Sequence, residues 1–225
     1  MASKAADIVT VDGPSGAGKS TISHLLAEKL GYSYLDTGAM YRAVGLLITS
    51  AGIDEKDETA LAALLDTVVL DLRPTGGEMR VLLNGADVSA AIRTAEMGLI
   101  ASRVSAIPAV RRKLTDLQRT IASRGHYVAE GRDMGTVVFP DARHKFFLDA
   151  SAEERARRRT EQLAEKGQFV PYATILEQIN RRDRDDAGRA LAPLKPAPDA
   201  IVIDSSRLSI EAVVETMLAH IRTGI

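Results

Sequence analysis

The chain has 225 residues, 45% of them hydrophobic, and a formal net charge of -1. That composition is typical of a globular protein, and it excludes a disordered chain and a protein held to nucleic acid by a strongly basic surface. Because cysteine is absent, disulfides, thiol catalysis and cysteine-based zinc sites are excluded too. Residues 1–6 contain no apolar run typical of a signal peptide, and no stretch approaches the length of a membrane span. We therefore expect a cytoplasmic protein with no membrane partner and no nucleic-acid partner.

The first predicted elements are a short β-branched strand, Ile8–Val11, and an amphipathic helix that ends near Gly31. The connection between them carries the pattern G-x-x-x-x-G-K-[ST], which begins at Gly13. In such a loop the free N–H groups of a helix N-terminus bind phosphate, Lys19 can reach the β and γ phosphates, and the Ser20 hydroxyl can ligate Mg²⁺. We therefore predict a phosphate-binding loop made of Gly13, Pro14, Ser15, Gly16, Ala17, Gly18, Lys19, Ser20 and Thr21.

The rest of the chain alternates strand-like and helical segments. Four further strands are predicted, at Tyr32–Leu35, Tyr127–Glu130, Lys145–Asp149 and Ala200–Asp204. Helical patterns cover 41–50, 57–65, 92–123 with a break near Pro108, 152–165, a segment from about 173, and 208–221. This alternation favours an α/β protein with a five-stranded parallel sheet.

Two strand-like runs, 68–72 and 79–83, do not fit this alternation. They are joined by Pro74–Glu78, and a short connection that contains Pro and Gly predicts an antiparallel hairpin. A parallel α/β architecture does not need one. Residues 66–90 are therefore predicted to form a small inserted antiparallel element.

A phosphate-binding loop serves switch GTPases, ATPase motors and small-molecule kinases alike, so other residues must indicate the acceptor. Arg132 and Asp133 follow a predicted core strand, at the edge where parallel sheets place ligands; the alternative is a tight turn with a surface ion pair. Arg182, Asp186 and Arg189 would share one helical face that could neutralise a transferring phosphoryl group. The alternative there is a solvated face with weak ion pairs.

A third cluster lies after the second predicted strand. A hydroxyl at Thr37 and a guanidinium at Arg42 could hold the phosphate of an acceptor. The alternative is a simple helix cap by Asp36 or Thr37. A guanine-binding motif N-K-x-D is absent, which argues against a GTP-binding switch, and the four histidines show no metal-ligand spacing.

Together these motifs resemble the bacterial cytidylate kinases, a branch of the nucleoside monophosphate kinases. The resemblance rests on D-G-P-S-G-A-G-K-S at 12–20, D-T-G-A-M-Y-R at 36–42, E-G-R-D-M-G-T-V-V-F-P-D-A at 130–142 and D-x-x-D-x-x-R-x-x-A-P-L at 183–194. It implies one domain, 1–225, with a three-layer P-loop kinase fold. Its core would span about 7–50, 125–152 and 190–225, with a monophosphate-binding insert at about 60–110 and a short lid at about 155–189.

The resemblance also implies a pyrimidine-nucleotide enzyme, acting as a monomer, that transfers the γ-phosphoryl group of ATP to CMP or dCMP with Mg²⁺. The implied ligands are Thr37, Arg42, Arg132 and Arg189 for the CMP phosphate, Ser102, Arg111 and Asp133 for the cytosine edge, and Arg182 and Asp186 for the ribose. Lys19, Arg132, Arg182 and Arg189 would carry catalysis without a general base. Ser20 is the expected metal ligand, with Asp36 or Asp133 ordering the metal's water shell. Another small-molecule P-loop kinase, acting on shikimate, dephospho-coenzyme A or another nucleotide, is the alternative.

Overall fold

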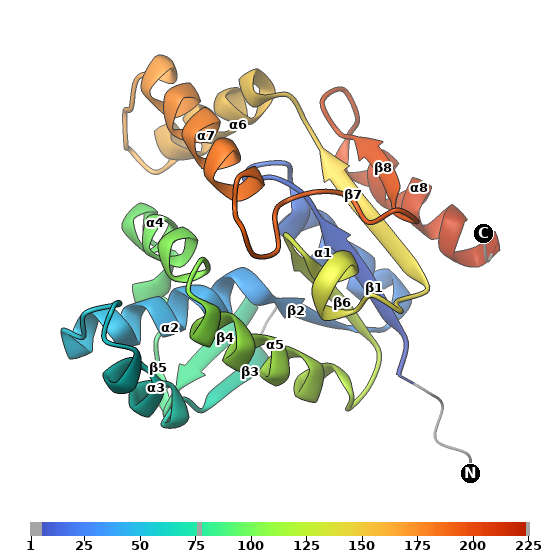
Figure 1. Cartoon of the computed structure of the whole chain (residues 1–225). Coiled ribbons are helices and arrows are strands. Elements are labelled where there is room, and N and C mark those ends of the chain that lie inside the picture. Colours follow the sequence, from blue (N-terminus) through green and yellow to red (C-terminus); the bar gives the residue numbers. More distant parts are fainter. Residues whose placement is uncertain (1–5, 76–77, 224–225) are drawn as a thin grey trace, which may run out of the picture. The chain divides into compact units, whose positions relative to one another are not determined.

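The computed structural model describes residues 6–75 and 78–223 (Figure 1). The chain divides into two compact units, each described separately here. The first contains the residues up to Tyr34 together with those from Ala122 onward, and the second contains Leu35–Ile121. The predicted core includes residues up to about 50, whereas the second compact unit begins at Leu35.

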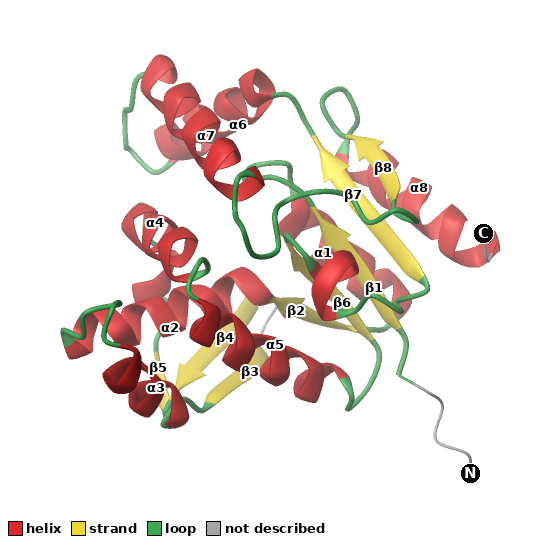
Figure 2. Ribbon diagram, viewed as in Figure 1, coloured by secondary structure: helices red, strands yellow, loops and turns green. Residues whose placement is uncertain are grey.

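A five-stranded parallel sheet is the framework of the fold, as predicted. Its strand order is β2-β6-β1-β7-β8 (Figure 2). The strands are β1 (Ile8–Asp12), β2 (Ser33–Asp36), β6 (Tyr127–Gly131), β7 (His144–Asp149) and β8 (Ile201–Asp204). In the register, Asp12 lies opposite Gly131 on one side and Phe147 on the other. The segments after β1 and β6 therefore leave the sheet at the same edge, where open α/β sheets bind ligands.

The core of the first unit explains why the β1 segment forms a central strand. Val9 and Val11 are fully buried in one hydrophobic cluster, while Thr10 and Asp12 point to the opposite face and are also buried. This β-branched run with both faces covered is typical of a parallel strand. Helices α1 (Lys19–Leu30) and α8 (Ile210–Thr223) complete the cluster with Leu26 and Met217.

Two antiparallel helices, α6 (Ala152–Glu165) and α7 (Tyr172–Ala187), follow β7 in the first unit. They share a small apolar cluster of Ala156, Leu163 and Ile175. Their remaining surface is rich in charge, and both helices fall where the sequence predicted them. They supply a second set of side chains near the phosphate-binding loop.

The second unit combines helices with a three-stranded antiparallel sheet of order β3-β4-β5. The predicted hairpin is confirmed, since β3 and β4 pair antiparallel; the two-residue strand β5 was not predicted. The unit contains α2 (Thr37–Ala51), α3 (Glu58–Asp66), β3 (Leu70–Thr75), β4 (Glu78–Leu83), β5 (Ala86–Asp87), η1 (Ala91–Arg93), α4 (Ala95–Val104) and α5 (Pro108–Ala122). Across residues 6–75 and 78–223, no helix has the length and apolar character needed to cross a bilayer.

Candidate active site

The phosphate-binding loop lies between β1 and α1. Gly13 has a φ of 147°, and a Cβ added there would come within 2.0 Å of the Leu148 carbonyl oxygen on β7. A side chain is therefore excluded by the neighbouring strand as well as by the backbone conformation. Gly18 takes the left-handed conformation as the N-cap of α1, so the helix begins at Lys19 with its free N–H groups facing the loop.

Lys19 is held by the loop itself. Its Nζ donates a hydrogen bond to the Pro14 carbonyl oxygen at 2.7 Å, and the residue is only 6% exposed. Burial, together with the nearby positive charge of Arg132, lowers the pKa of Lys19 from 10.5 to about 7. An anionic phosphate would restore the charged form, so the loop contains a cation whose environment favours a negative ligand.

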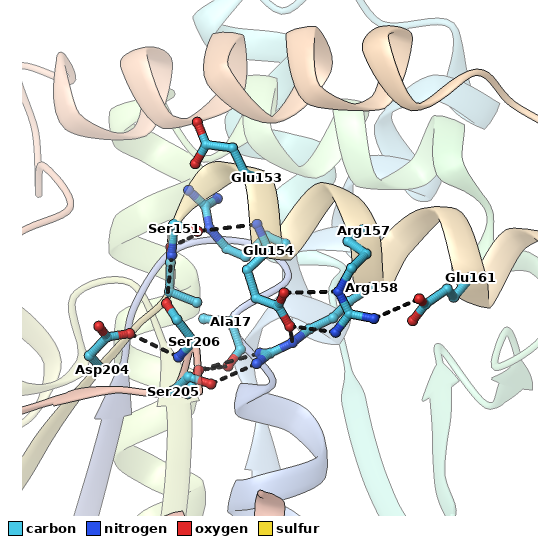
Figure 3. Close-up of polar contacts among 12 residues, drawn as sticks. Ala17, Ser151, Glu153, Glu154, Arg157, Arg158, Glu161, Asp204, Ser205 and Ser206 are labelled. Carbon is cyan, nitrogen blue, oxygen red and sulfur yellow. Dashed lines mark hydrogen bonds and ion pairs between the residues drawn. The ribbon is translucent and has the colours of Figure 1, made fainter. Parts of the chain in front are cut away.

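The back of the loop is supported by side chains from distant parts of the chain. Arg155 on α6 donates to the Ser15 carbonyl oxygen at 3.2 Å, and Ser205 Oγ donates to the Ala17 carbonyl oxygen at 3.1 Å. Ser205 is fixed in turn by Arg158, whose Nη2 donates to its carbonyl oxygen at 2.6 Å (Figure 3). Arg155 and Ser205 are not among the site residues predicted from the sequence.

Glu130 and Ser20 provide oxygen atoms suited to a divalent cation. Ser20 Oγ donates to Glu130 Oε1 at 2.8 Å, so a hydroxyl and a carboxylate lie together beside the loop. A hydroxyl and a carboxylate are hard ligands of the kind that Mg²⁺ prefers. In the part of the chain that the structure describes, no group of three His, Cys, Asp or Glu side chains forms a ready-made metal site.

Asp12 connects the loop to the segment that follows β6. Its two carboxylate oxygens accept hydrogen bonds from the backbone N–H groups of Met134 and Gly135, each at 2.8 Å. These residues open a single π-helical turn, Met134–Val138, with buried Asp133 at its N-cap. Burial raises the pKa of Asp12 to about 6, despite the two N–H donors. The turn was not predicted.

Three arginines gather around one buried carboxylate in the first unit. Asp186 is 1% exposed and accepts hydrogen bonds from Arg132 Nε, at 3.0 Å, and from Arg189 Nη2. Arg182 Nε lies 4.0 Å from the same carboxylate. Burial alone would raise the pKa of Asp186, but the charges of Arg132, Arg189 and Arg182 outweigh it and hold the pKa below its ordinary value. Three guanidinium groups and one carboxylate leave a net charge of two positive units for an anion.

The other predicted acceptor ligands belong to the second unit. Thr37 is the first residue of α2, and Asp36 caps this helix by accepting from Ala39 N at 2.8 Å. Asp36 also forms an ion pair with Arg42 at 3.1 Å. The helix cap by Asp36, considered as the alternative for this cluster, is therefore present. Binding of an acceptor phosphate by Thr37 and Arg42 stays a prediction.

Arg111, predicted to recognise the base, is 7% exposed on α5. It donates to the Ser105 carbonyl oxygen at 3.1 Å, and its guanidinium carbon lies 5.9 Å from the centre of the Tyr41 ring. These contacts hold the side chain in one orientation. Ser102 lies on α4 of the same unit.

The phosphate-binding loop, its buried lysine and the parallel sheet with β1 between β6 and β7 define a P-loop nucleotide-binding protein. A model of the cytidylate kinase family matches residues 9–223. A cytidylate kinase from Pasteurella multocida is 49% identical over 215 residues, covering 96% of this chain and 95% of the relative. Cytidylate kinase 1 from Haemophilus influenzae is 51% identical, covering 97% and 95%. The chain belongs to the cytidylate kinase family.

Among solved structures, an uncharacterized protein from Eubacterium ventriosum superposes with a TM-score of 0.52 at 12% identity. The match covers 97% of this chain and 99% of that chain. At this identity the likeness shows the fold alone.

Proposed function

We propose that the protein transfers the γ-phosphoryl group of ATP to CMP or dCMP and releases ADP with CDP or dCDP. The observation that carries this proposal is the cluster of Arg132, Arg182 and Arg189 around Asp186, in the same unit as the phosphate-binding loop. Arg132 directly follows β6, and the end of β6 is level with Asp12 at the start of the loop. The phosphate-binding loop and the arginine cluster are thus two anion-binding sites near one edge of the sheet, which suits a reaction between two phosphates.

The mechanism requires charge neutralisation and alignment, with no general base. Lys19 would hold the β and γ phosphates of ATP, while Arg132, Arg182 and Arg189 would neutralise the transferring group and the acceptor phosphate. A Mg²⁺ ion held beside Ser20 would supply further neutralisation of the phosphate charge. Ser20 would ligate the ion, with Asp36 or Asp133 ordering its water shell, and we add Glu130, which accepts a hydrogen bond from Ser20, as a further candidate.

A comparison of phosphate acceptors tests the proposed reaction directly. ADP release would be measured with ATP and Mg²⁺ in the presence of CMP, dCMP, UMP, AMP or shikimate. Activity confined to the cytidine nucleotides is the expected result. Activity with shikimate or another acceptor alone would contradict the cytosine assignment, and no ADP release with any acceptor would contradict the kinase assignment.

Glu130→Gln is expected to raise the Mg²⁺ concentration needed for half-maximal activity about tenfold, because outer carboxylates orient a metal's ligands. The amide keeps the size of the side chain and a hydrogen bond to Ser20 but loses the charge. Mn²⁺ binding in the presence of ADP, followed by electron paramagnetic resonance, should weaken in parallel. Glu28→Gln, on the exposed side of α1, is the control. Equal metal affinity in both variants would remove Glu130 from the metal site.

The remaining acceptor ligands are proposed as the resemblance implied them. Thr37 and Arg42 would bind the CMP phosphate together with Arg132 and Arg189, and Arg182 and Asp186 would contact the ribose. Ser102 and Arg111 would recognise the cytosine edge with Asp133. Support comes from the fixed orientation of Arg111 against Tyr41 and from the burial of Asp133.

Asp133→Ala is expected to lower the ratio of kcat/KM for CMP over that for UMP by about tenfold. Cytosine presents a donor amino group where uracil presents an acceptor, so a carboxylate favours cytosine. Both kcat/KM values would be measured on the same preparation, which cancels losses of active protein. An unchanged ratio would assign base selection to other residues.

We also propose that residues of about 60–110 bind the monophosphate and that residues of about 155–189 form a lid over the core. The antiparallel sheet of the second unit and the paired helices α6 and α7 support this division. The enzyme is proposed to act as a monomer in the cytoplasm, independently of nucleic acid and membranes. Light scattering after size exclusion would test the oligomeric state.

A further inference from the structure

We propose that Arg155 is a positioning residue that joins the phosphate-binding loop to helix α7. The inference rests on the proposed function, because it concerns how the donor and acceptor sites are held relative to one another within the first unit. Arg155 lies in the first turns of α6 and is only 4% exposed. It does not belong to any of the predicted binding sets.

The guanidinium group of Arg155 contacts three separate elements. Its Nε donates to the Ala150 carbonyl oxygen at 2.8 Å, just after β7, and its Nη1 donates to the Ser15 carbonyl oxygen at 3.2 Å, in the loop. Nη1 and Nη2 together bind both carboxylate oxygens of Asp183 on α7, at 3.0 Å and 2.6 Å. One planar group with fixed donors thereby sets the relative positions of a strand end, the loop and α7.

The aliphatic part of Arg155 also packs on the loop. A Cβ added at Gly16 would lie 3.3 Å from Arg155 Cβ and 3.6 Å from Cγ. The loop backbone thus lies against the stem of the side chain at Gly16 while the guanidinium holds the neighbouring carbonyl. This double contact indicates that the loop conformation depends on Arg155.

Helix α7 carries side chains of the arginine cluster beside the partner of Arg155. Arg182 directly precedes Asp183, and Asp186 follows one helical turn later, where it binds Arg132 and Arg189. A displacement of α7 would move Asp186 and the arginines that it holds. Because Arg155 contacts both the loop and α7, occupancy of the loop by phosphate and the position of the cluster are coupled. Such coupling acts equally in both directions.

The test uses Asp183→Ala and Arg155→Lys, with Asp185→Ala as the matched control, since Asp185 is an exposed neighbour on the same helix. The affinity for CMP would be measured by calorimetry with and without a non-hydrolysable ATP analogue, and the reverse titration would be performed as well. In the unmodified enzyme each ligand is expected to strengthen binding of the other. Asp183→Ala should reduce about fivefold the factor by which each ligand strengthens binding of the other. The affinity for the ATP analogue in the absence of CMP should stay within about twofold of that of the unmodified enzyme.

Arg155→Lys is expected to weaken binding of the ATP analogue by about tenfold, even without CMP, because lysine cannot reproduce the forked contacts to the loop. If Arg155→Lys does not fold, Asp183→Ala still tests the proposal, because that variant removes only the contact between Arg155 and α7. Coupling that is unchanged in Asp183→Ala, or reduced equally in Asp185→Ala, would overturn the proposal. Failure of the unmodified enzyme to bind CMP would contradict the proposed function instead, while the effect of Arg155→Lys on the ATP analogue would still test the support of the loop.

Discussion

Replacing Lys19 by methionine is expected to lower kcat for CMP phosphorylation by about a thousandfold. Lys19 is the buried cation of the loop, and the developing charge on the transferring group would have no substitute for it. Methionine retains the length and apolar stem of the side chain, so the loop should keep its shape. Lys29→Met, on the same helix α1, removes only a surface ion pair with Glu215 at 3.0 Å, and it should retain nearly full activity.

Lys19→Met is also expected to change the number of protons taken up when ATP binds. In the free enzyme the pKa of Lys19 is lowered to about 7, so above pH 7 much of the side chain is neutral. ATP phosphates favour the ammonium form, so binding takes up a proton, and the affinity should fall as the pH rises above 7. Calorimetry at pH 8 in two buffers with different ionisation enthalpies would measure this uptake. Lys19→Met should abolish it, and equal uptake in both proteins would contradict the assignment.

Lys19 also affects the stability of the nucleotide-free protein. Its folded-state pKa of about 7 lies below the ordinary value of 10.5, so between these values the unfolded chain binds more protons. The contribution of Lys19 to the free energy of unfolding therefore rises with pH across that range. Bound ATP should remove this dependence by restoring the charged lysine.

Asp186→Asn is expected to lower kcat/KM for CMP about a hundredfold. The carboxylate holds Arg132 and Arg189 by direct hydrogen bonds, and the neutral amide would leave these guanidinium groups without their shared counter-charge. We also expect the free energy of unfolding to fall by about 2 kcal/mol at pH 7, less than for a fully buried pair because Arg132 is 21% exposed. Asp185→Asn, its exposed neighbour on α7, should change neither quantity.

The pH dependence separates this effect from a general loss of packing. The folded-state pKa of Asp186 lies below its ordinary value of 3.8. Its stabilising contribution is therefore fully present above 3.8 and is lost as the pH falls through the folded-state pKa. Unfolding by urea at pH 7 and at successively lower pH values would show the two proteins converging. A stability difference that persists unchanged in acid would contradict the electrostatic explanation.

The sequence predicted the elements that are determined by residues close together in the chain. Gly13 and Lys19 occur at a spacing that has one well-known structural meaning, and β1 is a β-branched run that suits a strand buried on both faces. The bounds of α6 were predicted from a charged helical pattern over 152–165, and the structure adds a cap at Ser151, which accepts from Glu154 N. The strand β5, two exposed residues long, has no periodicity that a sequence pattern could reveal.

The support of the loop could not be predicted for a different reason. Arg155 and Ser15 are 140 residues apart, Ser205 and Ala17 are 188 apart, and Glu130 lies 110 residues from Ser20. Helix α6 carries several arginines, and its packing after β7 determines which of them faces the interior. On the sequence, Arg155 is indistinguishable from Arg157, whose side chain is 56% exposed and pairs with glutamates on its own helix.

The strand order has a consequence for the time at which the protein becomes active during synthesis. β1 emerges from the ribosome before its two neighbours, β6 and β7, which begin more than a hundred residues later. Ser205, which holds the loop at Ala17, follows the last strand. The nucleotide-binding loop, which follows β1, is therefore completed only after β8 and Ser205 have been synthesised. Nascent chains that end before β8 should not be retained on immobilised ATP, whereas full-length chains should be.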